Sequence, residues 1–325
     1  MVIIYGRVSL IRKRRMAQQA VVEKIPFEER IRINRRNSAI LVFVFLVFLS
    51  ALGGFLGYLL TGNEAGTVVG GLMLLLLSLL WFVIAYYSGG NIVLSISGAM
   101  RVDKSFNPRL YNVVEEMSIA AGLPMPQIYV IRTNALNAFA TGRDPYHASV
   151  AVTTGLLEKL SRDELQGVIA HEISHIRNYD IRLMMLMAVL VGVVIIVSDL
   201  MLRLIRYVGP SLGRGRGKGG GAFAIFIIIG AVLAIVAPFI AYIIQFATSR
   251  QREYLADASG AELTRYPEGL ASALEKIAYE NMPMKQASKA TQHLFIVNPF
   301  MRLGGRSLFS THPPIEERIR RLRSM

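Results

Sequence analysis

The segment from Ser161 to His175 reads SRDELQGVIAHEISH and predicts a helix with polar chemistry on one face. Ser161 followed three residues later by Glu164 matches a capping box, and apolar residues follow at helical spacing. The helix should therefore begin at Ser161 and run through His171 and His175. Residues four apart on a helix share a face, so both imidazoles can reach one metal ion.

Glu172 follows His171 directly and completes a His-Glu-x-x-His pattern. Its carboxylate does not easily join the same set of ligands, but it can take the proton of a water held at the metal. That is the general-base step of metal-assisted peptide hydrolysis. The alternative is a solvated helix face with two incidental histidines. The metal site is the favoured interpretation, because the two histidines must lie on a helix to share one ion and the sequence predicts a helix here.

A catalytic zinc site needs a third protein ligand, and the chain has no cysteine to supply one. His175 lies eight residues before one apolar stretch and Glu253 seven residues after another. An antiparallel helix pair would bring both to the same side of the membrane, so Glu253 is the predicted ligand. A surface carboxylate paired with a neighbouring arginine is the alternative. The competing ligands are the other histidines, which are His147, His293 and His312.

Asp257 lies one helical turn beyond Glu253 on the same face. This position suits a carboxylate that orients a metal ligand from behind. An acid on a helix surface is the alternative interpretation.

Four apolar stretches predict a multi-span membrane protein, in keeping with a composition that is 53% apolar. Residues 38–60, 67–87 and 222–246 are uncharged and long enough to cross a bilayer as helices. Residues 183–198 form a shorter stretch that either crosses or dips. The first 37 residues carry ten Lys or Arg, which predicts a cytoplasmic N-terminal flank without a signal peptide.

The net charge of +14 invites a nucleic-acid interpretation, but the basic residues are spread over flanks and loops. No aromatic-interleaved motif of a DNA or RNA module is present. We therefore expect no nucleic-acid partner, and anionic lipid as the partner of the positive charge.

The remaining segments predict a folded domain of helices and a small sheet. A helix is predicted at Asn107–Ala121, and strands at Gln127–Arg132, Leu136–Ala140 and Ser149–Thr153. The predicted organisation is a basic cytoplasmic segment (1–37), two transmembrane helices (38–87), the first part of a catalytic domain (88–182), two further apolar helices joined by a basic glycine-rich loop (183–246), and the second part of the domain (247–325).

Three segments in this order resemble HtpX-type membrane metalloproteases, bacterial and archaeal relatives of the CAAX prenyl endopeptidases. They are Ala170–His175 (AHEISH), Ser249–Asp257 (SRQREYLAD) and Ser310–Pro314 (STHPP). The resemblance covers the chain from about residue 34 and implies an α+β fold: a zincin-like catalytic domain on a multi-span α-helical anchor. It also implies one zinc ion per chain on His171, His175 and Glu253, with the site facing the cytoplasm at the inner membrane.

The same resemblance implies roles for further residues. Asn137 and Ala138 match an edge strand that hydrogen-bonds the substrate backbone. His312 matches a histidine that supports the developing oxyanion, although a packing histidine before two prolines is the alternative. Arg318 matches a basic residue that contacts Asp257.

These features predict a membrane zinc endopeptidase with Glu172 as general base, which removes damaged or misfolded membrane proteins under stress. One alternative is a prenyl-protein endopeptidase, but four apolar stretches rather than a larger helical cage favour quality control. The other alternative is a non-enzymatic metal-binding scaffold. Because the spans at 38–60 and 67–87 are uncharged, they offer no ion path that would support it.

Overall fold

The computed structural model describes residues 27–190, 192, 250–280, 282–284, 287, 288, 290–300 and 313–325. Most of the predicted third and fourth apolar helices, the basic loop between them and His312 lie outside these residues. The described chain is mostly helical with one four-stranded sheet, in agreement with the predicted α+β class.

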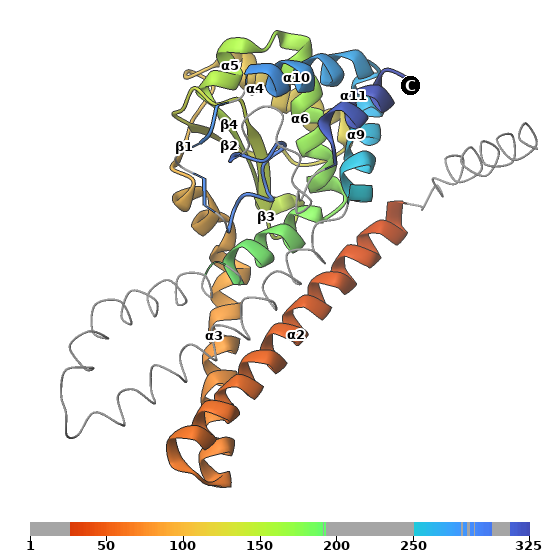
Figure 1. Cartoon of the computed structure of the whole chain (residues 1–325). Helices are drawn as coiled ribbons and strands as arrows, with labels where there is room; N and C mark the ends of the chain where they lie inside the picture. The colour runs from red at the N-terminus through yellow and green to blue at the C-terminus, as the bar shows by residue number, and fades with distance from the viewer. Residues whose placement is uncertain are drawn as a thin grey trace, which may run out of the picture.

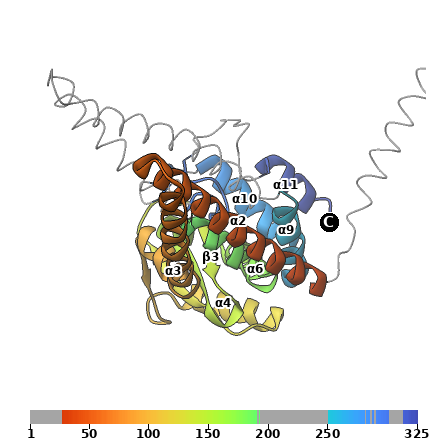
Figure 2. The same ribbon diagram turned by 90° about the horizontal axis from the view of Figure 1, so that it is seen from below.

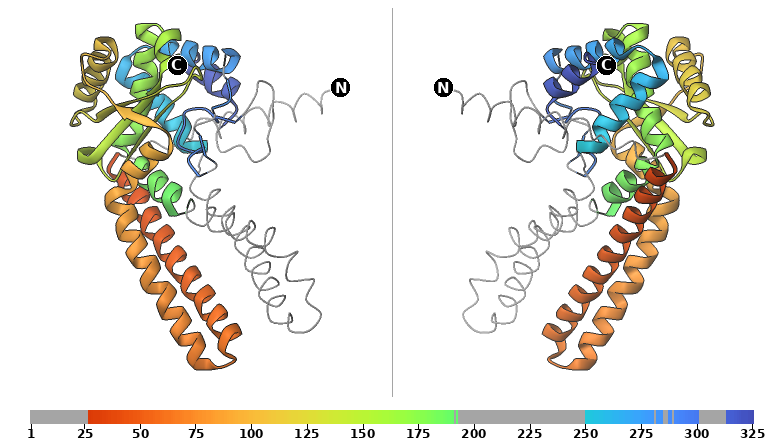
Figure 3. Two further views of the ribbon diagram at one scale, coloured as in Figure 1. Left: turned by 90° about the vertical axis from the view of Figure 1, so that its left-hand side faces the viewer. Right: turned by 90° about the vertical axis from the view of Figure 1, so that its right-hand side faces the viewer.

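Two long helices project from the domain as an antiparallel hairpin (Figures 1 and 3). They are α2 (Phe27–Thr61) and α3 (Glu64–Ile96), and each contains a segment long and apolar enough to cross a membrane. Large apolar side chains point outward along both, with Phe43, Leu76 and Tyr87 each at least 65% exposed. A continuous apolar surface of this kind fits a bilayer.

Both helices are longer than the predicted spans. α2 begins at Phe27 rather than at residue 38, and α3 continues to Ile96 rather than residue 87. Apolar length sets how much of a helix can cross a membrane, whereas the helix itself ends at a capping signal. Here Gly98, with a φ of 64°, turns the chain away from α3 and into the domain.

Glycines allow α2 and α3 to approach closely. A Cβ atom added to Gly53 or Gly57 would collide with the carbonyl oxygen of Gly70 or Gly66 on the facing helix. Small residues at the contact are typical of paired membrane helices.

The sheet has the strand order β1-β2-β4-β3. Its strands are β1 (Ala99–Arg101), β2 (Gln127–Ile131), β3 (Ala138–Gly142) and β4 (Ala148–Thr153). β2 and β4 are parallel, and the other two pairs are antiparallel. β3 therefore lies at one edge of the sheet.

The predicted strands agree with β2 and β4 to within one residue, but β3 begins at Ala138, two residues later than predicted. The turn before it continues to Asn137, whose backbone bonds the Thr153 side chain in both directions. β1 was not predicted, because three residues are too few to show an alternating pattern.

Helices cover the sheet and make up the rest of the domain. They are α4 (Pro108–Ala121), α5 (Thr154–Lys159), α6 (Arg162–Arg177), α9 (Arg250–Thr264), α10 (Pro267–Glu280) and α11 (Ile315–Leu322), with a short 3-10 helix at Pro145–His147. α6 packs against α4, α9, α10 and β3. The predicted capping box is confirmed, because Ser161 and Glu164 each accept a hydrogen bond from the other's backbone N–H.

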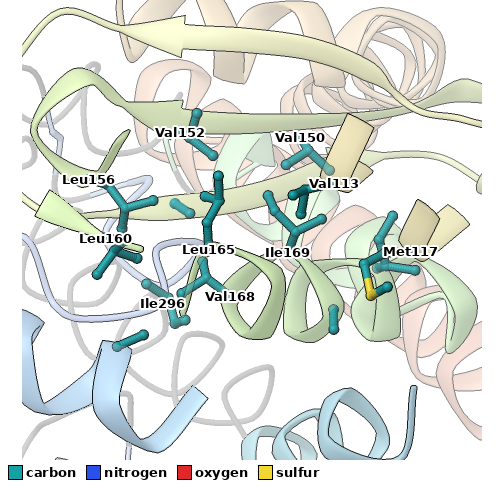
Figure 4. Close-up of a cluster of buried hydrophobic side chains, with 14 of the residues drawn as sticks. Val113, Met117, Val150, Val152, Leu156, Leu160, Leu165, Val168, Ile169 and Ile296 are labelled. Atoms are coloured by element: carbon teal, nitrogen blue, oxygen red, sulfur yellow. The ribbon is translucent and has the colours of Figure 1, made fainter. Parts of the chain in front are cut away.

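The sheet is buried on both faces. On one face, Val150 and Val152 of β4 pack against Leu165 and Ile169 of α6 (Figure 4). Ala151 points to the other face, into a cluster shared with α2, α3 and residues 183–190. Residues 183–190, the start of the predicted third stretch, are helical and buried. The helical hairpin and the α+β domain therefore share a core.

Candidate metal centre

Two histidines of α6 and one glutamate of α9 converge in the interior. The Nε2 atoms of His171 and His175 lie 3.2 Å apart. The Glu253 carboxylate lies 3.7 Å from the Nε2 of His175 and 4.0 Å from that of His171. All three side chains are buried, and their ligand atoms lie within 4.8 Å of one another, so they could hold one metal ion.

Close packing of two helices brings Glu253 to the histidines. Gly260 of α9 faces the backbone of α6, where an added Cβ atom would lie 3.0 Å from the backbone nitrogen of His171. A larger residue at this position would push the helices apart and move Glu253 away from the histidines.

Each histidine has its own carboxylate on the Nδ1 side. The Nδ1 of His171 lies 3.0 Å from Asp257 of α9, and that of His175 lies 3.0 Å from Asp180. Such partners fix the ring orientation and leave Nε2 to face a metal. The sequence indicated Asp257 by its spacing on α9. It did not indicate Asp180, which lies beyond the end of α6, where helical spacing no longer fixes direction.

Asp257 is paired in turn with Arg318 of α11. The Arg318 guanidinium donates to both Asp257 oxygens, at 2.8 and 2.7 Å, and to the Ile296 carbonyl at 2.9 Å. Its Nη1 also lies 3.5 Å from Glu253. The contact between Arg318 and Asp257 that the resemblance implied is therefore present.

Glu172 lies beside the metal-binding cluster and is 1% exposed. The backbone N–H of Ala140, in edge strand β3, donates to its carboxylate. Burial, reinforced by the negative charge of Glu253, raises the pKa of Glu172 to about 7. A carboxylate poised near neutral pH is suited to act as a general base.

The surroundings shift the pKa values of the two histidines in opposite directions. Burial lowers the pKa of His171, against the opposing effect of Asp257. Burial also lowers the pKa of His175, but the surrounding carboxylates, Asp180 first among them, outweigh it and raise the pKa to about 9. A proton therefore competes with a metal for His175 near neutral pH.

Comparison with known proteins assigns this site to a family. Residues 104–325 match the family described as Peptidase family M48. The chain belongs to peptidase family M48. This membership makes it a metallopeptidase, as predicted.

Its curated relatives in the family are similar over nearly their whole length. The chain is 48% identical to the "Protease HtpX homolog" of Thermoanaerobacter pseudethanolicus, over 90% of this chain and 95% of that protein. It is 48% identical to the protein of the same name from Dictyoglomus turgidum, over 92% and 95% respectively. The resemblance to HtpX-type membrane metalloproteases is thus confirmed.

Among solved structures, the chain is similar to the crystal structure of S. mikatae Ste24p, with a TM-score of 0.45 and 19% identity. The similarity covers 76% of this chain, but only 57% of that protein's length.

In this M48 peptidase, Ala138 is the first residue of edge strand β3 and Asn137 directly precedes it, and both are buried. The Asn137 side chain donates to the Val297 carbonyl at 2.9 Å, and the Ala138 carbonyl accepts from the Ile296 N–H at 2.9 Å. At this end of β3, the outward-facing carbonyl is therefore already bonded within the chain. Substrate binding by this pair stays a prediction.

The competing histidines of this M48 peptidase lie elsewhere or outside the described residues. His147 is exposed and lies 2.8 Å from Asp144 in the loop before β4. His293 is buried, with its Nε2 3.1 Å from the Met184 carbonyl. Neither belongs to the cluster that could hold a metal. His312 lies outside the described residues, so its role at the oxyanion stays a prediction.

Proposed function

We propose that this chain is a membrane-anchored zinc endopeptidase that hydrolyses peptide bonds of membrane or misfolded proteins. The observation that carries the proposal is the buried Glu172 carboxylate beside the cluster of His171, His175 and Glu253. Membership of peptidase family M48 supports peptide hydrolysis.

Zinc fits the three ligands. Zinc bonds to imidazole nitrogen and carboxylate oxygen are about 2.0–2.2 Å long, which puts ligand atoms of a tetrahedral site roughly 3.3–3.5 Å apart. The two Nε2 atoms lie 3.2 Å apart, and the three ligand atoms, one per residue, lie within 4.8 Å of one another. The Glu253 carboxylate must therefore move slightly closer to the histidines. Two histidines and one glutamate also leave a fourth position open, as a catalytic site requires.

The residues around the cluster would have separate roles in the proposed reaction. His171, His175 and Glu253 would hold the zinc ion, which would supply Lewis acidity for the attacking water and the scissile carbonyl. Glu172 accepts the proton of the attacking water and can return it to the leaving amine. Asp257 and Asp180 hold the rings of His171 and His175 in place, which fixes the orientation of both ligands. His312 would support the oxyanion.

The shape of the hairpin supports a cytoplasmic site. Two crossings by α2 and α3 return the chain to the side on which it began, and the ten Lys or Arg of the first 37 residues favour the cytoplasmic side. Near the domain, Arg182 lies 5.8 Å from the Tyr86 ring and Arg143 lies 5.1 Å from the Tyr87 ring. Such aromatic and basic pairs suit the headgroup level of a membrane with anionic lipid.

We further propose that the chain is a multi-pass protein of the inner membrane that acts in protein quality control under stress. Its partners would be polypeptides, and a substrate strand would add at the edge strand β3 near Glu172.

The proposal is tested with purified full-length protein in detergent or nanodiscs. A model membrane protein and a prenylated C-terminal peptide serve as alternative substrates, each with wild type and Glu172→Gln. We expect zinc-dependent cleavage of the membrane protein by wild type alone. Preferential cleavage of the prenylated peptide would support the CAAX-type alternative, and cleavage of neither substrate would contradict the proposal.

A further inference from the structure

We propose that Asn34 of the first membrane helix is a positioning residue of the metal centre, acting on His175 through Asp180. The inference rests on the proposed role of His175 as a metal ligand. It makes the anchor a structural part of the site.

Asp180 is the direct partner of His175. Its Oδ2 atom lies 3.0 Å from the Nδ1 of His175, while the Nε2 on the far side of the ring faces His171 and Glu253. An Nδ1–H donated to Asp180 leaves the Nε2 lone pair free for a metal. The orientation of His175 therefore depends on where Asp180 is held.

Asn34 holds Asp180 from α2. Its Nδ2 atom donates to the second carboxylate oxygen of Asp180 at 2.7 Å and to the Asn178 carbonyl at 2.8 Å. Asn34 is only 6% exposed, so water competes little for these bonds. One amide group thus fixes two points of the turn that follows α6.

The two histidines are supported differently. Asp257, behind His171, is fixed by Arg318 of the catalytic domain. Asp180, behind His175, interacts electrostatically with Arg252 of α9, which interacts in the same way with Glu253. The hydrogen bond to Asp180 from outside the catalytic domain comes from Asn34.

The turn held by Asn34 has an unfavourable backbone. Tyr179, between Asn178 and Asp180, has a φ of 60°, which a residue with a bulky side chain rarely adopts. Two guanidiniums contact its ring: that of Arg35 on α2 lies 4.7 Å from the ring centre, and that of Arg182 lies 5.1 Å from it. Such a conformation persists where neighbouring contacts impose it, and two adjacent residues of α2 supply part of them.

The arrangement links the metal centre to membrane insertion. Seen from below, α2 crosses the underside of the catalytic domain near α6 (Figure 2), and the Asn34 bonds establish the contact. Asn34 lies just before the apolar stretch that begins at residue 38. A chain whose first helix is not seated would therefore lack one of the two supports behind its zinc ligands.

The test compares zinc affinities by chelator competition on full-length protein in nanodiscs. All variants carry Glu172→Gln to prevent self-cleavage. Asn34→Leu keeps the number and branching of the side-chain heavy atoms and removes both N–H donors. Asp180→Ala removes the partner, and Ser38→Ala is the control. Ser38 is buried one turn further along α2, and its hydroxyl donates to the Asn34 carbonyl at 2.9 Å, away from Asp180.

We expect Asn34→Leu and Asp180→Ala each to weaken zinc binding about ten- to hundredfold, the usual effect of removing a group behind a metal ligand. The double variant should bind about as weakly as Asp180→Ala alone, because both act through one path. Ser38→Ala should bind like the parent. General loosening of the fold would instead lower the metal-free Tm equally in Asn34→Leu and Ser38→Ala.

Unchanged affinity in Asn34→Leu, or losses that simply add in the double variant, would overturn the inference. Asn34→Ala replaces the leucine variant if that one does not fold, with the same two outcomes. Failure of the parent itself to hold zinc would count against the proposed function, so the two hypotheses fail separately.

Discussion

Arg318 makes a bidentate ion pair with Asp257, with N···O distances of 2.8 and 2.7 Å, although both residues are at most 2% exposed. Desolvation makes such a pair costly, and it persists because each partner has further contacts. Asp257 also contacts His171, and Arg318 also binds the Ile296 carbonyl. The C-terminal helix α11 is thereby tied to the metal-binding helix α6.

Removing this arginine should destabilise the fold as well as the site. Arg318→Ala leaves the Asp257 charge buried without its main partner, which typically costs about 3–5 kcal/mol. The Tm of the protein and its zinc content should both fall. Arg320→Ala is the matched control, because Arg320 is exposed and pairs with Glu317, worth at most about 1 kcal/mol. Equal stability of the two variants would show that the buried pair contributes little.

Removing the third ligand should release the metal. Glu253→Ala leaves two protein donors, too few for tight retention, so zinc content and activity should fall together. His293→Ala is the comparison, since His293 is buried but lies outside the metal-binding cluster. Its zinc content should stay near wild type. Full zinc occupancy in a folded Glu253→Ala protein would move the third ligand elsewhere, with His312 as the next candidate.

Zinc affinity should depend on pH through His175. Its pKa in the metal-free protein is raised to about 9, so at neutral pH the metal must displace a proton. Apparent affinity should rise about tenfold per pH unit up to that value and then level off. Chelator competition between pH 6.5 and 9.5 measures the slope. Asp180→Asn removes the leading cause of the raised pKa and should move the plateau to lower pH; an identical profile would contradict this account.

The topology should place both ends of the hairpin on the cytoplasmic side. A reporter at Gly62, in the turn between α2 and α3, is expected outside, and one at Met325 in the cytoplasm. Four full crossings would also put Gly217 outside, although residues 203–221 hold five Lys or Arg and no acid, which favours the inside. We expect the crossing arrangement, because residues 222–246 are apolar. A cytoplasmic Gly217 would make the third and fourth stretches a dipping pair.

The features of the site that a single helix determines could be predicted from the sequence. His171 and His175 share a face because they are four apart, and Asp257 follows Glu253 for the same reason. The approach of Glu253 to the histidines followed from the chain returning to the same side of the membrane. These inferences need spacing and connectivity, which a sequence contains.

Contacts that depend on the chain beyond the end of a helix could not be predicted from the sequence. Asp180 contacts His175 only because the chain turns sharply at Tyr179, a residue with no intrinsic preference for that backbone. Asn34 reads as an ordinary polar residue ahead of an apolar stretch, since its partners are 144 and 146 residues away. The Ala140 N–H that donates to Glu172 belongs to the backbone, so no residue type marks it.

The decisive experiment separates chemistry from metal binding at Glu172. Glu172→Gln keeps the size and polarity of the side chain but removes its basicity, so zinc should stay bound while the rate falls about a hundredfold to ten-thousandfold. His171→Ala deletes a ligand and should lose zinc as well as activity. Metal analysis and a cleavage assay on the same samples distinguish the two defects, and chelation of wild type followed by added zinc should restore cleavage. A Glu172→Gln protein that retains zinc and cleaves at the wild-type rate would show that another group takes the proton.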